Sequence, residues 1–271
     1  MTGYLVIKCG GSVIEQLSAS FFENIRRIQN EGRYFPVIVH GGGPAISDLL
    51  KKLDIENVFH DGLRVTTAEV LDVAEMQLSG TVNKKLVSSL QVSGAKAVGI
   101  SGIDGGLFTA EAIDLSTLGY VGTIAAVNPA VIELFCHAGY IPVVSPISAD
   151  ADGNHLNINA DQAAAGLAAA LHAKLCFISD VPGVLVDQSG QMKCFEKLSS
   201  LEIKQLIAAR KIHGGMIPKV TAAVECLKQH VSEVVILSGT TPDGLLHYAE
   251  GRSVGTKIFI EEETCHAQSV I

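Results

Sequence analysis

The sequence predicts an α/β protein in which crossover helices connect the strands of a mostly parallel sheet. Short aliphatic runs alternate with longer segments of helical period along the whole chain of 271 residues. The aliphatic runs are apolar throughout, as expected for parallel strands covered on both faces. Apolar residues make up 48% of the chain and aromatic residues only 5%, so aliphatic side chains must build the core.

Six of these aliphatic runs are predicted to be strands of the sheet. Each is short and is followed by a polar or glycine-rich segment, which favours a strand over a buried helix. In chain order they are Tyr4–Lys8, Pro36–His40, Ala97–Ile100, Ile141–Ser145, Leu175–Ser179 and Val234–Leu237.

Two serines have the spacing of a helix capping box. Ser20 stands three residues before Glu23, and Ser199 stands three residues before Glu202. In a capping box the serine hydroxyl accepts a hydrogen bond from the backbone N–H three residues later, and the glutamate accepts one from the serine N–H. Each pair opens a segment of helical period, so we predict that a helix begins at each.

Two further helices help to divide the chain. The segment Asn128–Gly139 has a proline suited to a first turn and ends at a glycine. The alanine-rich segment Ala160–Leu171 is predicted to be a buried helix packed closely on the sheet. Because the alternation restarts after it, we predict a soft boundary between residues 1–173 and residues 174–271, with one sheet shared by both.

Charge and composition exclude several classes of protein. Twenty Lys and Arg against 28 Asp and Glu leave a formal charge of −8, the wrong sign for coating a nucleic acid. An anionic ligand must therefore be held by a few placed cations and backbone amides. No apolar run reaches membrane-spanning length, and the first residues lack the pattern of a signal peptide. Six scattered cysteines and nine dispersed histidines favour free thiols in a reducing cytoplasm and no protein-bound metal.

Consecutive glycines follow two of the predicted strands. Gly10 and Gly11 follow the first strand, and Gly41, Gly42 and Gly43 follow the second. The carboxyl ends of strands are where open α/β sheets bind ligands, and glycine lets an anion approach the backbone amides. The segments match neither the Walker pattern nor the dinucleotide fingerprint, which disfavours a P-loop NTPase and a Rossmann dehydrogenase.

Three cations stand where they could meet an anion. Lys8 ends the first predicted strand, and Lys219 follows a pair of glycines. Either lysine could contact a phosphoryl oxygen or could be a solvated surface charge. Arg64 follows a glycine in a loop, a position suited to bidentate capture of a carboxylate.

Two polar segments interrupt apolar surroundings. Asn159 or Asp161 could cap or begin the alanine-rich helix, but this would not explain Asn157, which alternates with Asn159 as on one face of an extended segment. The segment Ser179–Val184 follows a predicted strand and is either a plain turn or a ligand contact.

Taken together, six segments resemble motifs of the amino acid kinase family and occur in the family's order from Lys8 to about Phe259. They are Lys8-Cys9-Gly10-Gly11, His40-Gly41-Gly42-Gly43-Pro44, Asp61-Gly62-Leu63-Arg64-Val65-Thr66, Asn157-Ile158-Asn159-Ala160-Asp161-Gln162-Ala163, Ser179-Asp180-Val181-Pro182-Gly183 and Gly214-Gly215-Met216-Ile217-Pro218-Lys219. The third and fourth motifs argue against the aspartate, glutamate 5-, carbamate and uridylate kinases of the family.

This resemblance implies a three-layer αβα sandwich with two lobes on one mostly parallel sheet. Residues 1–173 would bind an acyl amino acid and form a homodimer, and residues 174–271 would bind ATP. The implied reaction is phosphorylation of the γ-carboxylate of N-acetyl-L-glutamate, the second step of arginine biosynthesis. The implied substrates are N-acetyl-L-glutamate and ATP, with Mg²⁺ carried by ATP and no nucleic-acid or membrane partner.

The resemblance also assigns roles to individual residues. Lys8 and Lys219 would stabilise the transferring phosphoryl group, and Asp161 would orient both. The substrate would be held by Gly42, Gly43, Arg64 and Asn157. The nucleotide would be held by Gly10, Gly11, Asp180, Val181, Pro182, Gly183, Val184, Leu185, Lys211, Ile212 and His213.

The chemistry agrees with these assignments. A γ-carboxylate is ionised at neutral pH, so as a nucleophile it needs no general base. Catalysis must instead bring two anions together, which requires positioning and charge stabilisation. Two alternatives remain: a kinase for an aminoadipate derivative of lysine biosynthesis, and a sensor without activity.

One departure from the family bears on regulation. Members inhibited by arginine carry an N-terminal helix, whereas the first strand here begins at about Tyr4. The resemblance therefore implies a homodimer that is insensitive to arginine.

Overall fold

A single eight-stranded sheet forms the centre of the molecule in a computed structural model, which describes residues 3–188, 191–229 and 231–261. Its strand order is β14-β16-β15-β11-β1-β2-β8-β5. All neighbouring strands are parallel except the pair β15 and β16. The strands are β1 (Gly3–Cys9), β2 (Tyr34–His40), β5 (Ala97–Ser101), β8 (Ile141–Ser145), β11 (Lys174–Ser179), β14 (Lys197–Ser199), β15 (Glu233–Ser238) and β16 (Thr256–Phe259).

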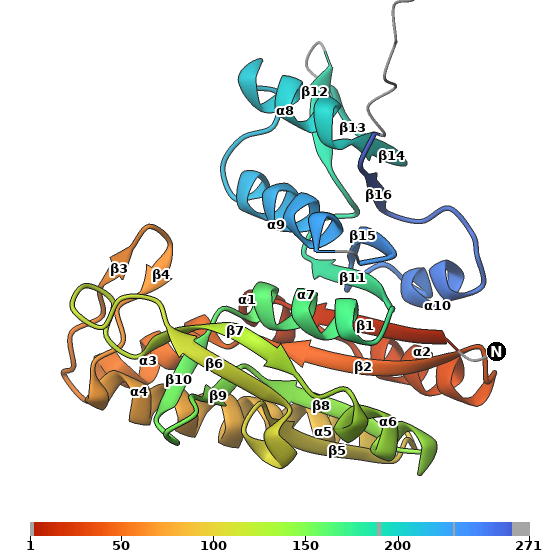
Figure 1. Cartoon of the computed structure of the whole chain (residues 1–271). Coiled ribbons are helices and arrows are strands. Elements are labelled where there is room, and N and C mark those ends of the chain that lie inside the picture. Colours follow the sequence, from red (N-terminus) through yellow and green to blue (C-terminus); the bar gives the residue numbers. More distant parts are fainter. Residues whose placement is uncertain (1–2, 189–190, 230, 262–271) are drawn as a thin grey trace, which may run out of the picture.

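The six strands predicted from aliphatic runs are confirmed and lie side by side in this sheet. Their side chains alternate between two apolar clusters, as the period of a strand requires. In β1, Leu5 and Ile7 belong to the cluster on one face, whereas Val6 belongs to the cluster on the other. The sheet is therefore the middle layer of three (Figure 1).

Helices cover both faces of the sheet. One face is covered by α2, α5 and α10, and the other by α6, α7, α8 and α9. The bounds are α1 (Gly11–Ile14), α2 (Ala19–Asn30), α3 (Gly43–Lys52), α4 (Ala68–Glu75), the π-helix η1 (Met76–Val82), α5 (Asn83–Val92), the 3₁₀ turn η2 (Asp104–Gly106), α6 (Ala130–His137), α7 (Ala160–Ala170), α8 (Ser200–Ala208), α9 (Met216–Lys228) and α10 (Gly244–Ala249). No helix in the described ranges is both long and apolar enough to cross a membrane.

Only one of the two predicted capping boxes is present. At α8, Glu202 N donates to Ser199 Oγ over 3.1 Å and Ser199 N donates to Glu202 Oε2 over 2.7 Å. The prediction for Ser20 is wrong, because the N-cap of α2 is Ser18, two residues earlier, and its side chain makes no capping bond. The Ser20 hydroxyl instead hydrogen-bonds the Ser18 hydroxyl over 2.8 Å.

Three smaller β units were not predicted. The largest is a closed four-stranded unit of β6 (Phe108–Ala112), β7 (Val121–Val127), β9 (Ile147–Ala149) and β10 (His155–Ile158). The others are hairpins of β3 (Phe59–His60) with β4 (Leu63–Arg64), and of β12 (Leu185–Gln188) with β13 (Gln191–Cys194).

The two halves of the chain occupy different parts of the molecule. Residues 1–173 supply β1, β2, β5 and β8 of the sheet, and later residues supply the other four strands. In Figure 1, α8, α9 and β12–β16 gather together, away from α3, α4 and the four-stranded unit. The division between residues 173 and 174 stays a prediction. Residues 262–271, which include Cys265, lie outside the described part of the chain.

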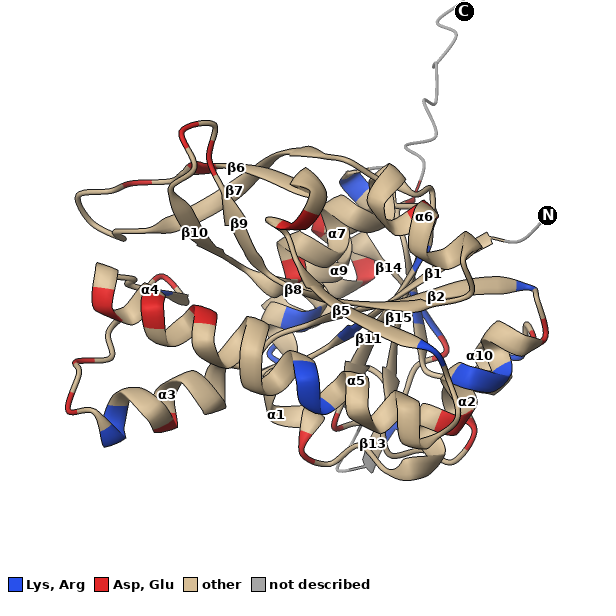
Figure 2. Cartoon of the chain, turned by 90° about the horizontal axis from the view of Figure 1, so that it is seen from below, with Lys and Arg blue, Asp and Glu red and all other residues tan. Residues whose placement is uncertain are grey.

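In Figure 2 the basic and acidic residues are interspersed along the ribbon, and α4 carries several acidic residues. This agrees with the formal charge of −8 and leaves anion binding to individual cations and amides.

Candidate active site

The two glycine loops lie against each other at the carboxyl ends of β1 and β2. Gly41 N donates to Cys9 O over 3.0 Å, which joins the two strand ends. A Cβ atom on Gly11 would lie 2.9 Å from Gly43 N, closer than real Cβ contacts allow. Helix α3 begins at Gly43, so its free N-terminal amides lie in the same place. Glycine is therefore required here for close packing of the two loops, which brings backbone amides together.

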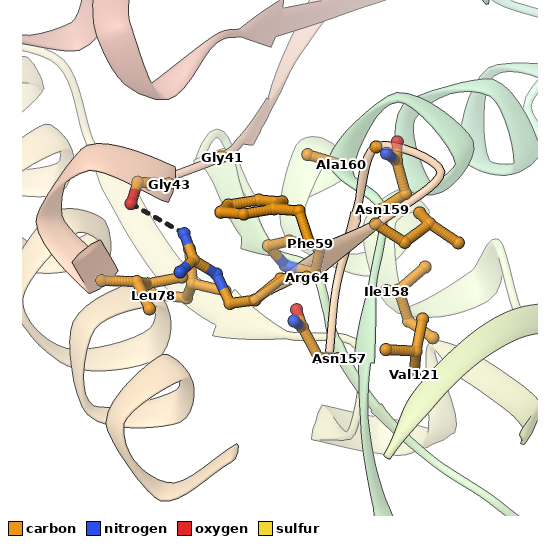
Figure 3. Close-up of a pocket in the computed structure, with 15 residues that line it drawn as sticks. Gly41, Gly43, Phe59, Arg64, Leu78, Val121, Asn157, Ile158, Asn159 and Ala160 are labelled. Carbon is orange, nitrogen blue, oxygen red and sulfur yellow. Dashed lines mark hydrogen bonds between the residues drawn. The ribbon is translucent and has the colours of Figure 1, made fainter. Parts of the chain in front are cut away.

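A pocket of about 190 Å³ lies beside the second loop. Figure 3 shows Arg64 and Asn157 on its wall, with Gly43 within hydrogen-bond distance of Arg64. Its apolar wall includes Leu78, Val121 and Ile158. The pocket thus combines backbone amides, one cation and two asparagines, Asn157 and Asn159, with an apolar surface, as small-molecule sites do.

Arg64 is fixed in this pocket by contacts with neighbouring residues. Its Nη2 donates to Gly43 O over 3.0 Å and to Ser47 Oγ over 3.1 Å, and its Nη1 donates to Asn57 Oδ1. Its guanidinium carbon lies 4.7 Å from the centre of the Phe59 ring, in a cation–π contact.

The charge of Arg64 has no partner of opposite sign. The residue is only 9% exposed, and burial lowers the pKa of its guanidinium. Among the described residues, the arginines that form ion pairs are Arg27 and Arg252, and Arg64 forms none. An uncompensated buried cation is costly, so this arrangement favours binding of an anion at Arg64.

Asn157 is tied to Arg64 through a threonine. Asn157 Nδ2 donates to Thr66 Oγ1 over 3.2 Å, and Thr66 Oγ1 donates to Arg64 O over 2.8 Å. Asn157 pairs with Val121 in the parallel ladder of β10 and β7. The small β unit therefore carries one side of the pocket.

Lys8 meets Asp161 next to the glycine loops. Lys8 Nζ lies 2.6 Å from Asp161 Oδ1, an ion pair without the alignment of a hydrogen bond. Asp161 is in the first turn of α7, where Asn159 is the N-cap and accepts from Asp161 N over 2.8 Å. The capping interpretation of Asn159 is thus confirmed, and Asp161 has a separate contact.

Lys219 has different partners from those expected. Its Nζ lies 2.8 Å from Asp180 Oδ1 and 2.9 Å from Ser179 Oγ. The Lys219 ammonium lowers the pKa of the Asp180 carboxyl. The structure therefore places Asp161 against Lys8, whereas Lys219 is held by the residues that follow β11.

The segments expected to hold a nucleotide divide into accessible and buried residues. Lys211 and His213 are exposed, and Asp180 faces solvent beside Lys219. The side chains of Val184 and Ile212 are instead fully buried in the core, so only their backbone could contact a ligand. The Val184 N–H is already donated to Thr256 Oγ1 over 2.8 Å.

Gly183 packs as tightly as the loop glycines. A Cβ atom there would lie 2.6 Å from Thr256 Oγ1 and 2.8 Å from Cys194 Sγ. Val181 N donates to Ser179 Oγ over 3.3 Å, Pro182 follows it, and Leu185 begins β12. The turn interpretation of this segment therefore fits its internal bonds, and the Gly183 contact is made within the protein.

Sequence reasoning missed the residues that hold Arg64. Ser47 lies one helical turn after Gly43 in α3, a spacing that could have indicated it once the helix start was known. Asn57 and Phe59 carry no such signal, because the short β3–β4 hairpin brings them to Arg64.

The match that decides the family covers most of the chain: residues 3–238 fit the profile described as the amino acid kinase family. The chain belongs to the amino acid kinase family. Its predicted αβα fold with a mostly parallel sheet is confirmed by this match and by the observed topology.

Relatives of this amino acid kinase match it over nearly their full length. The acetylglutamate kinase of Geobacillus kaustophilus is 48% identical, over 94% of this chain and 95% of the relative. The acetylglutamate kinase of Oceanobacillus iheyensis is 43% identical, over 97% of this chain and 98% of the relative. The solved Streptococcus mutans protein smu.665 superposes with a TM-score of 0.81 at 32% identity, over 95% of this chain and 99% of that one.

Proposed function

We propose that this amino acid kinase phosphorylates the γ-carboxylate of N-acetyl-L-glutamate with ATP, as the second step of arginine biosynthesis. The observation that carries the proposal is the buried Arg64, which has no carboxylate partner and lies beside the paired glycine loops. The near full-length relatives named acetylglutamate kinases support it.

Arg64 and Asn157 would hold the amino acid end of the substrate. The guanidinium would bind the α-carboxylate, which supplies the charge that the pocket lacks. Asn157 would hydrogen-bond the acetamido group, and Val121 and Leu78 would contact its apolar parts. This leaves the γ-carboxylate directed toward Gly42 and Gly43.

The reaction would then need charge stabilisation and no proton transfer. A γ-carboxylate oxygen forms a bond to the γ-phosphorus while the bond to the ADP oxygen breaks, and ADP leaves with the electron pair. Lys8, held by Asp161, and Lys219 would balance charge on the transferring phosphoryl group. The amides of Gly10, Gly11, Gly42 and Gly43 would contribute further donors.

We propose that Mg²⁺ arrives bound to ATP, where it neutralises phosphate charge. The carboxylates at this end of the sheet, Asp161 and Asp180, each already contact a lysine. The described residues contain no cluster of three or more metal-ligating side chains. Such a donor set fits an ion held chiefly by phosphate oxygens and water.

The direct test is an assay with ATP and Mg²⁺ in which hydroxylamine traps the acyl phosphate. N-acetylglutamate, glutamate, aspartate and N-acetylaminoadipate are supplied in parallel. We expect turnover of N-acetylglutamate, with kcat/KM about 100-fold above that for free glutamate, whose charged amine does not fit an amide contact. Absence of N-acetylglutamate turnover would refute the proposal, and preference for N-acetylaminoadipate would identify the lysine-pathway alternative.

We also propose a cytoplasmic homodimer that arginine does not inhibit, in which residues 1–173 bind the acyl amino acid and residues 174–271 bind ATP. Light scattering of the purified chain should give twice the mass of 28.5 kDa. Arginine at millimolar concentration should leave the rate unchanged. A hexamer or strong inhibition would contradict this proposal without affecting the reaction.

A further inference from the structure

His40 and Asn83 form a polar pair that is buried beneath the second glycine loop. Both are fully buried, His40 as the last residue of β2 and Asn83 as the first residue of α5. Neither lines the pocket, so neither meets the substrate directly. Burying two polar side chains in a core is costly unless their hydrogen bonds are satisfied, so their bonding shows what they do.

The carbonyl groups around Asn83 determine the orientation of its amide. Asn83 Nδ2 donates to Val143 O over 2.9 Å, and Asn83 Oδ1 accepts from Lys84 Nζ over 3.0 Å. Nδ2 also lies 3.2 Å from His40 Nε2. Because Nδ2 can only donate, Nε2 must be the acceptor and carries no proton.

The tautomer of His40 follows from this bond. With Nε2 unprotonated, the single ring proton of a neutral His40 is on Nδ1. Nδ1 lies 3.0 Å from Gly41 O and therefore donates to it. Burial lowers the pKa of His40 to about 4, in agreement with a neutral ring.

That hydrogen bond fixes a peptide plane of the glycine loop. Gly41 O and Gly42 N belong to one planar trans peptide, so they point in opposite directions. On the other side, the Gly41 N–H is held by Cys9 O over 3.0 Å. The Gly42 N–H has no acceptor among the residues that the structure describes, and Gly42 lines the pocket.

A peptide between two glycines turns over easily, since neither neighbour has a Cβ to restrict it. We propose that His40 and Asn83 are a positioning pair that holds the Gly41–Gly42 peptide with its N–H toward the reacting carboxylate. This inference rests on the proposed function of the loop. His40 and Asn83 act through the backbone and not on the substrate.

The surrounding structure accommodates this pair. A Cβ atom on Gly99 of β5 would overlap Asn83 Oδ1, so glycine at that position makes room for the amide. The π-helix η1 ends directly before Asn83, and its Leu78 would lie 2.8 Å from a Cβ atom on Gly42. The π-helix η1 thus packs against the glycine loop through Leu78 and places Asn83 next to His40.

Two substitutions of His40 separate positioning from stability. In His40→Asn the side-chain amide can take the place of Nδ1 and keep the donor to Gly41 O, while the contact to Asn83 is lost. In His40→Gln the amide can take the place of Nε2 and keep the contact to Asn83, while the donor to Gly41 is lost. Each variant loses one buried hydrogen bond, so we expect similar decreases in Tm.

Their activities should differ. With N-acetylglutamate, His40→Gln should lower kcat about ten-fold or more, because removing one oriented donor from a reacting site has effects of this size or larger. KM for ATP should change less than about three-fold, and His40→Asn should keep kcat within about three-fold of the parent. Ser148→Ala, which removes a buried hydrogen bond to Phe108 O in the four-stranded unit, is the matched control and should leave kcat unchanged. Equal kcat values for the two folded His40 variants would overturn the proposal.

A second measurement does not depend on activity. The ¹⁵N chemical shifts of the His40 ring in the parent protein at pH 7 should show a protonated Nδ1 and an unprotonated Nε2. The opposite tautomer would overturn the positioning role even if the chain were inactive or His40→Gln did not fold. An inactive parent with the expected tautomer would refute the proposed function alone.

Discussion

Arg64 and Lys219, two of the cations at the candidate site, are held in different ways. Arg64 is 9% exposed and held by three hydrogen-bond acceptors and an aromatic ring. The Lys219 side chain is 36% exposed and is held by Asp180, whose side chain is 53% exposed. The guanidinium of Arg64 is thus fixed by buried contacts, whereas the ammonium of Lys219 is paired with an exposed carboxylate, which the phosphate of our proposal would have to displace. If the proposed assignments hold, the rigid site is the one that binds the amino acid, and the site whose ion pair must exchange is the one that binds the nucleotide.

The largest expected effect tests whether Lys8 and Lys219 both act on the phosphoryl group, even though the Lys219 side chain is paired with an exposed carboxylate. Lys8→Ala and Lys219→Ala should each lower kcat by about 100- to 1000-fold, with KM values changed only a few-fold, because charge is stabilised mainly in the transition state. Steady-state kinetics measure both constants.

Lys228→Ala is the matched control for Lys219 because Lys228 lies on the same helix in an exposed pair with Glu225. It should leave kcat unchanged. A loss confined to Lys8→Ala would show that Lys219 does not stabilise the transition state and would widen the contrast between the two sites.

Acid should destabilise the folded protein through His40, which lies beneath the second glycine loop. The pKa of His40 is about 4 in the folded protein against an ordinary 6.5, owing first to burial and also to the charge of Lys84. Above pH 6.5 the imidazole ring is neutral in the folded and in the unfolded protein. Between pH 6.5 and 4 the ring becomes protonated in the unfolded protein but stays mostly neutral in the folded protein. The free energy of unfolding should therefore fall by about 3 kcal/mol between pH 6.5 and 4 from this group.

Urea unfolding at several pH values, compared with His40→Asn, isolates that contribution, since all other titrating groups are shared. The variant should lose less stability over this range. Parallel pH curves for the two proteins would mean that His40 is not held neutral.

Removing the fixed cation should affect substrate binding more than turnover. Arg64→Ala should raise KM for N-acetylglutamate by about 10- to 100-fold, the value of charge-assisted hydrogen bonds, and leave KM for ATP nearly constant. Arg64→Lys should recover little, since an ammonium cannot reproduce the planar set of donors to Gly43, Ser47 and Asn57.

The exposed Arg27 provides the control, and Arg27→Ala should leave both KM values unchanged. If Arg64→Ala lowered kcat alone, the guanidinium would act on the reacting atoms, and the assignment to the α-carboxylate would fail.

The smallest effect concerns stability alone. Ser199→Ala removes a formed capping box and should cost about 1 kcal/mol in the free energy of unfolding, whereas Ser20→Ala should cost less than about 0.5 kcal/mol. Urea unfolding measures both values. Equal costs would show that the hydroxyl contact between Ser20 and Ser18 matters as much as a cap.

The central sheet could be predicted because its strands are aliphatic on both faces. The strands β14 and β16 were missed because both are short and contain lysine, and β14 is the edge strand of the sheet. β14 pairs with β16, and β16 pairs antiparallel with β15, so tertiary context decides their place in the sheet more than their own sequences do. The two predicted capping boxes also show that local spacing is not sufficient. Ser199 is the N-cap of α8 and forms the box with Glu202, whereas the N-cap of α2 is Ser18 and the box predicted at Ser20 does not form.

The position of the glycine loops could be predicted because a motif fixes the backbone there. The contacts of individual side chains could be predicted less well, because they depend on how distant elements pack. Glycines after β1 and β2 had to lie at one end of the sheet, and they do. The partner of Lys219 depends on how α9 sits against β11, and the burial of Val184 and Ile212 depends on the packing of the later half of the chain. Sequence spacing carries neither piece of information.

The π-helix η1 also sets the rotational phase of the helix that follows it. An α-helix turns about 100° per residue and the wider π-helix turns less, so winding the same residues Met76–Val82 as regular α-helix would turn Asn83 away from its present direction. The helix could then remain intact and the protein folded while the amide faced away from His40. The width of the helical turn at this one place, more than the identity of any single side chain, would decide whether the Gly41–Gly42 peptide keeps its orientation.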